Sequence, residues 1–272
     1  MNIKNLIPAV LLLITLSSCT KVINVDLNSA NPNMVVDAEI ADQPGPYKVS
    51  LTKTVNFSDD NIFPAVSGAV IVLSDNAGNS ETLAETSPGN YTSAHLQGVV
   101  GRTYNISINT NGKTYTAVST MPAALTLDSL VADSTDKGNG FGGGSKKSGF
   151  SIRAAFSDPP GVTNYYRLVE YVNNVPNYDN IVVISDKLRD GTSIGTYVTR
   201  RDTAIHKGDT ITVSLQCIDA NVYEYFRTLD QITSDQGGLQ TTSPGNPTSN
   251  LSNNALGFFS AYAVRSKTIV IQ

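Results

Sequence analysis

The feature that most constrains this fold is a recurring set of short segments in which apolar and polar residues alternate. In the segment 47–54, Tyr47, Val49 and Leu51 fall on one face and polar residues fall on the other. A period of two indicates a β-strand with one wet face. Similar segments, separated by Pro, Gly and Asn, occupy 33–40, 64–73, 103–109, 113–119, 150–156, 165–172, 181–184 and 209–217. The sequence therefore predicts a mainly β protein.

The spacing of the turn signals predicts two β-sandwich modules. Seven short strands at regular intervals over 33–122 are typical of an Ig-like or transthyretin-like sandwich. Alternation resumes after Met121-Pro122, so we assign 123–272 to a second sandwich module. Two long loops interrupt it, a flexible glycine-rich loop at 138–149 and a polar loop at 236–254. The polar loop has two interpretations, a contact surface or protection of a sheet edge.

One short helix is expected near the C-terminus, over 219–232. Val222, Tyr225 and Leu229 recur there at helical spacing, and Asp219 is suited to the N-cap position.

The N-terminus predicts a lipid-anchored protein. Residues 1–18 combine a positive start with an apolar run at 6–16, which has signal-peptide length and is too short to span a membrane. Leu16-Ser-Ser-Cys19 matches a bacterial lipobox, which predicts cleavage before Cys19 and acylation of its thiol. Several acyl chains on one cysteine give stable anchoring. Residues 19–32 would then form a tether that reaches about 40 Å when extended.

Composition argues against several functional classes. The net charge is −4 and there is no long basic run, so nucleic acid is not an expected partner. With Cys19 acylated, Cys217 has no disulfide partner and is expected to be a small buried residue. The absence of tryptophan weakens a glycan-binding interpretation, although twelve tyrosines offer similar surfaces.

We find no motif that predicts an enzyme or a cofactor. Gly138-x-Gly140-x-x-Gly143 matches a dinucleotide fingerprint, but no helix follows it. The two histidines, His95 and His206, lack ligand-spaced partners and are expected in solvated loops. A Ser-His-Asp triad is not ruled out by counting residues, but no Gly-x-Ser-x-Gly elbow is present.

We also predict no metal site. Asp133-Ser-Thr-Asp136 offers clustered oxygens of the kind that calcium prefers, but the EF-hand spacing is missing. Turn or cap roles are the more common use of such residues. Asp158-Pro-Pro-Gly161 is interpreted as a turn.

The densest aromatic cluster is the candidate binding surface. It consists of Tyr165, Tyr166, Tyr171 and Tyr178. Alternate tyrosines on a strand can pack into the core, whereas outward-facing ones can contact a partner, because tyrosine is enriched at interfaces.

Several stretches resemble an uncharacterised family of Bacteroidota outer-membrane lipoproteins that contain a domain of unknown function. They are Cys19-Thr-Lys-Val-Ile, Met34-Val-Val-Asp-Ala, 47–54, 64–73, Asn246-Pro-Thr-Ser-Asn250 and Ala255–Tyr262. Members of that family are often encoded beside TonB-dependent outer-membrane receptors. The resemblance implies an accessory lipoprotein of such a receptor and supplies no catalytic residues.

The expected function is therefore that of a non-enzymatic lipoprotein of the outer membrane that assists a TonB-dependent receptor. The alternative is a cell-surface lipoprotein that binds glycan or peptide on its own. Asp26 is the only acidic residue of the tether, so the sequence leaves the membrane leaflet open.

Overall fold

The computed structural model describes residues 32–56, 59–134, 149–199, 205–233 and 245–272. Residues 1–31, which include the predicted signal peptide, Cys19 and most of the predicted tether, lie outside these residues. Within the described ranges, the fold is mainly β with one helix near the C-terminus, as the sequence predicts. The strands of the first module are β1 Met34–Ala41, β2 Lys48–Lys53, β3 Val70–Asp75, β4 Ser80–Thr82, β5 Ala84–Ser87, β6 Asn90–Thr92, β7 Thr103–Thr110 and β8 Lys113–Thr120.

The second module continues the chain with six more strands before the last strand. They are β9 Ser129–Ser134, β10 Phe150–Ser157, β11 Tyr165–Val172, β12 Val175–Ser185, β13 Ser193–Tyr197 and β14 Thr210–Ile218. The helix α2 spans Ala220–Thr233 and the last strand β15 spans Leu256–Val270.

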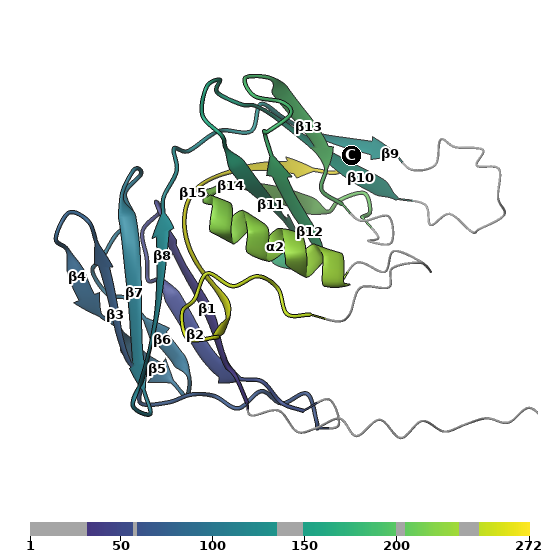
Figure 1. The fold of residues 1–272 in the computed structure, drawn as a ribbon. Coiled ribbons are helices and arrows are strands. Elements are labelled where there is room, and N and C mark those ends of the chain that lie inside the picture. The colour runs from purple at the N-terminus through teal and green to yellow at the C-terminus, as the bar shows by residue number, and fades with distance from the viewer. Residues whose placement is uncertain (1–31, 57–58, 135–148, 200–204, 234–244) are drawn as a thin grey trace, which may run out of the picture.

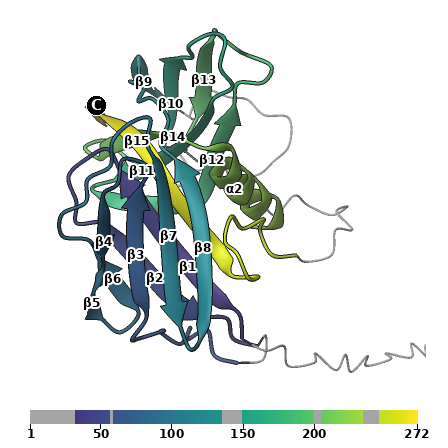
Figure 2. The same ribbon diagram turned by 60° about the vertical axis from the view of Figure 1, so that its left-hand side comes forward.

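The strands that the structure describes form three sheets. One eight-stranded sheet has the order β12-β11-β14-β15-β1-β2-β6-β5. The four-stranded sheet β4-β3-β7-β8 packs on one half of it, and the three-stranded sheet β13-β10-β9 packs on the other. In Figure 2 the four-stranded sheet lies in front of β1, β2 and the first part of β15. The result is two sandwiches, each with its own core.

The last strand, β15, joins the two sandwiches. Its residues 256–262 pair in parallel with β1, and its residues 263–270 pair antiparallel with β14. Near its middle, β15 therefore stops pairing with β1 along one of its edges and starts pairing with β14 along its other edge. The sequence assigned this strand wholly to the second module, whereas the structure makes its first half part of the sheet of the first module.

The described part of the polar loop, 245–254, protects the open edge of β15. The side chain of Asn250 accepts the N–H of Phe259 at 3.0 Å and donates to the Phe259 carbonyl at 2.8 Å. Ser249 donates to the Gly257 carbonyl at 2.8 Å. These side chains take the place of a neighbouring strand, which favours the edge-protection interpretation for this part of the loop.

The helix α2 covers the face of the large sheet that is opposite the two smaller sheets (Figure 1). The carboxylate of Asp219 accepts the N–H groups of Asn221 at 2.9 Å and Val222 at 3.0 Å, so the predicted N-cap is confirmed. Val222 and Phe226 are buried against Phe258 of β15. Because Phe259 and Ala261 of β15 point into the first core, alternation places Phe258 on the helix side.

Cys217 is buried, as expected. It lies on β14 in the second core and is a free cysteine. Desolvation raises the pKa of its thiol to about 11, so it is an inert core residue.

Gly257 is predicted to be required for the pairing of β15 with β1. Its φ is +88°, and a Cβ built there would lie 1.9 Å from the Val36 carbonyl oxygen of β1. We expect Gly257→Ala to lower the free energy of unfolding by at least about 2 kcal/mol more than Gly112→Ala does. Gly112 is the matched control, because its φ is +72° and open space surrounds it. Equal losses in urea unfolding of the two variants would contradict this role.

Candidate functional site

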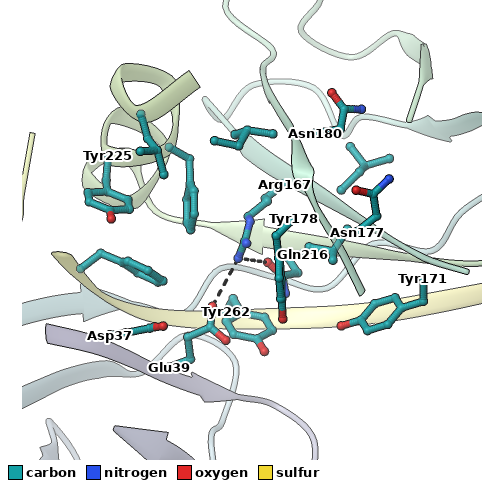
Figure 3. A pocket seen from close by; sticks show the side chains of 16 residues that line it. Asp37, Glu39, Arg167, Tyr171, Asn177, Tyr178, Asn180, Gln216, Tyr225 and Tyr262 are labelled. Carbon is teal, nitrogen blue, oxygen red and sulfur yellow. Dashed lines mark hydrogen bonds and ion pairs between the residues drawn. The ribbon is translucent and has the colours of Figure 1, made fainter. Parts of the chain in front are cut away.

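A recess of about 300 Å³ lies between α2 and the face of the large sheet that α2 covers (Figure 3). Residues of β12, the outermost strand of that sheet, also line it. Four adjacent strands, β11, β14, β15 and β1, supply its floor. The lining residues are Asp37, Glu39, Arg167, Leu168, Val169, Tyr171, Asn177, Tyr178, Asn180, Ile181, Gln216, Tyr225, Phe226, Leu229, Phe258 and Tyr262. The recess thus combines residues of both modules.

Strand alternation explains why polar residues of β1 face the recess. Val36 and Ala38 are fully buried in the first core, so Asp37 and Glu39 point to the other side of the sheet. In a free-standing sandwich that side would be solvated. Here α2 lies over that side, so the polar residues of β1 form part of the floor of the recess.

Arg167 of β11 is the central charged group of the recess. Its Nη1 lies 3.3 Å from Glu39 Oε1 and 3.3 Å from Gln216 Oε1. Its guanidinium carbon lies 3.9 Å from the ring centroid of Phe226. A charge, an amide and an aromatic face therefore hold the guanidinium in one orientation.

Two carboxyl groups share this recess with one guanidinium. Desolvation raises the pKa of Asp37 and of Glu39, and the charge of Arg167 acts in the opposite direction on both. Because Arg167 bonds to Glu39, the charge of Asp37 is offset only at longer range. Among the described lining residues, negative side chains thus outnumber positive ones by one.

Aromatic residues form the remaining walls. Tyr225 and Phe258 have ring centroids 4.9 Å apart, and Phe226 lies 4.8 Å from Phe258. Desolvation raises the pKa of Tyr225, Tyr262 and Tyr178, so their hydroxyls stay protonated and remain hydrogen-bond donors.

The structure divides the four tyrosines predicted as a binding surface. Tyr171 and Tyr178 line the recess, and Tyr178 is 63% exposed. Tyr165 packs on Tyr223 of α2, with ring centroids 4.9 Å apart. Tyr166 requires a correction: it is 1% exposed and packs edge-to-face on Phe156 in the second core, because alternation turns it away from its neighbours.

The other residues weighed from the sequence do not converge on the recess. His95 and His206 are exposed in loops, as predicted. Asp133 bonds to Arg153 and Tyr197 on the surface. Asp136, the fingerprint glycines 138, 140 and 143, and residues 236–244 lie outside the described residues.

The sequence did not reveal the charged groups of the recess. Asp37 and Glu39 occur at alternate positions of a strand, which is the usual pattern of a solvated face. Arg167 sits in the tyrosine-rich segment and follows the same pattern. Only the pairing of β15 with both β1 and β14 brings them together.

The chemistry of the recess suits binding. The lining offers carboxylates, amides, phenolic hydroxyls and aromatic faces, which recognise polar or cationic groups.

Asp37 is predicted to lower stability at neutral pH. Because its native pKa is raised above 3.8, the native state binds more protons than the unfolded state, and stability falls as pH rises through this window. We expect Asp37→Asn to raise the Tm at about pH 7.5 and to lose this advantage near pH 4. Asp60→Asn, which removes an exposed loop carboxylate, is the control. A pH-independent effect of Asp37→Asn in calorimetry would contradict the assignment.

The comparisons with known proteins concern the chain as a whole. The sequence model of one family matches residues 20–268, which include both modules and most of β15. No curated protein matches the chain. The structure has no helix, among the residues it describes, with the length and apolarity needed to cross a membrane. The match over almost the entire length shows that the chain belongs to the family described as a domain of unknown function, DUF4249.

Proposed function

We propose that this chain is a non-catalytic lipoprotein of the Bacteroidota outer membrane that binds a TonB-dependent receptor. We further propose that the recess under α2 is its recognition site. The observation that carries this proposal is the set of two carboxylates and one guanidinium held among aromatic rings at the junction of the modules.

The energetics of the recess support a binding role. The raised pKa of Asp37 and Glu39 means that their ionised forms lower the stability of the fold at neutral pH. Functional sites often hold groups with perturbed pKa values at a cost in stability. Arginine and tyrosine in a partly desolvated concavity are also the residue types that dominate binding energy at interfaces.

The surplus negative charge suggests what the recess recognises. A lysine or arginine side chain of the partner would meet Asp37 and the aromatic faces of Tyr178 and Tyr225 together. The hydroxyl oxygens of the tyrosines would accept hydrogen bonds from its N–H groups. This chemistry fits a basic segment of a receptor.

A second candidate function is direct capture of a glycan or peptide. The exposed ring of Tyr178 and the amide of Gln216 favour it, because aromatic faces with side-chain amides also suit sugars. In this alternative the protein acts without a receptor.

The anchor rests on the lipobox. Acylation of Cys19 would hold the body at the membrane, and residues 19–32 would separate it from the lipid.

We expect Cys19→Ala to abolish incorporation of labelled palmitate and to release the protein from the membrane fraction. Cys217→Ala is the matched control, because that thiol is buried in the second core and should leave labelling unchanged. Labelling that survives in Cys19→Ala would refute the proposed anchor.

For the recess, we expect Tyr178→Ala to reduce co-purification of the receptor with the detergent-extracted protein at least about tenfold, as loss of an aromatic anchor does at interfaces. Tyr197→Ala removes a similarly exposed tyrosine, on β13 away from the recess, and should bind as the wild type does. If no receptor co-purifies but a glycan or peptide library binds in a Tyr178-dependent manner, the second candidate replaces the first.

A further inference from the structure

Three carboxylates meet at one end of the second sandwich, away from the recess. Asp158 follows β10, and Asp186 and Asp190 lie in the connection from β12 to β13. One oxygen of each carboxylate lies within 4.8 Å of the others. Asp158 begins the turn that the sequence predicts over Asp158–Gly161, and its carboxylate is buried, with 4% of the residue exposed.

Asp186 carries the strongest signal. The residue is 1% exposed, and its Oδ2 accepts the N–H of Asn164 at 2.7 Å. Its Oδ1 is buried and has no hydrogen-bond partner, which holds for no other buried side-chain oxygen or nitrogen of the described residues. A buried carboxylate oxygen without a partner is costly, so it points to a ligand.

The surrounding backbone holds the cluster in place. Gly191 donates its N–H to Asp158 Oδ2 at 2.9 Å, and Gly161 donates its N–H to Asp190 Oδ1 at 2.8 Å. The Tyr166 hydroxyl donates to Asp158 Oδ1. Each of the two loops, β10–β11 and β12–β13, thus donates a hydrogen bond to a carboxylate of the other loop. The protein itself therefore holds the carboxylates in position.

The three carboxylates of the cluster form no ion pair with the side chains that the structure describes. Three like charges at this separation repel one another strongly where two of the groups are buried.

We propose that Asp158, Asp186 and Asp190 bind one calcium ion. Calcium is a hard cation that takes six to eight oxygen ligands in flexible geometry. Asp190 is exposed and gives the ion access from solvent, while Asp186 Oδ1 gains the partner it lacks. Magnesium demands near-ideal octahedral geometry and sheds water reluctantly, so calcium suits a cluster of two buried carboxylates better.

The ion would tie the two sheets of the second sandwich together. β10 and β13 belong to the three-stranded sheet, and β11 and β12 belong to the large sheet (Figure 1). The ligands lie in the loops that connect these sheets. β11 then begins at Tyr165, which packs on α2, so the ion would also steady the strand that carries Arg167.

The test is a calcium titration of the full mature protein after EGTA treatment, read by calorimetry and by the Tm. We expect binding with a Kd at or below about 1 mM, the upper range for extracellular calcium modules, and a rise in Tm. Asp190→Asn and Asp186→Asn should each weaken binding at least about tenfold. The control Asp60→Asn, an exposed carboxylate elsewhere, should bind as the wild type does.

The competing explanation is that the cluster binds no metal ion. The calcium response of the variants separates the two explanations. If calcium is the ligand, the Tm of the wild type should rise on addition of calcium, and the Tm of Asp186→Asn should not respond. No calcium response of the wild type at about 10 mM, or an unchanged response in both variants, would overturn the proposal.

Discussion

The strand β15 is the constraint on which the rest of the structure depends. One continuous strand of 15 residues completes the sheet of the first sandwich and then that of the second. β15 approaches β1 so closely at Gly257 that this position has no room for a side chain. Where the partner changes, Asp42 accepts the N–H of Val264 at 2.9 Å and pairs with Arg265 at 2.6 Å. The two sandwiches are thereby fixed relative to each other, which a flexible linker would not achieve.

The recess follows from this arrangement. The outer faces of two joined half-sheets would ordinarily be solvated, but α2 packs over them and leaves a concavity beside its apolar contacts. Arg167 comes from the second module and Glu39 from the first, so their ion pair crosses the junction. The geometry of a site built in this way depends on the relative position of the modules. Such a site suits a protein whose proposed role is to recognise another protein.

Much of the architecture could be predicted from local patterns, because strands and helix caps leave local signals. Alternation located the strands, and Asp219 with Val222 and Leu229 located α2. The site could be predicted only in part. Tyr171 and Tyr178 were found because they cluster in the sequence, whereas Asp37, Arg167 and Tyr262 are distant in sequence and meet through the pairing of β1, β15, β14 and β11. The cluster of Asp158 and Asp186 was missed because a carboxylate beside prolines has the local pattern of a turn.

The central claim is that the recess at the junction of the two modules contacts the partner. The most direct measurement is photo-crosslinking in intact cells from a reactive residue placed at Tyr178, compared with the same residue at Tyr197 and with mass-spectrometric identification of the product. The account predicts a cross-link from position 178 to an outer-membrane receptor and none to that receptor from position 197. A receptor cross-link from position 197 alone, or from neither position, would contradict it.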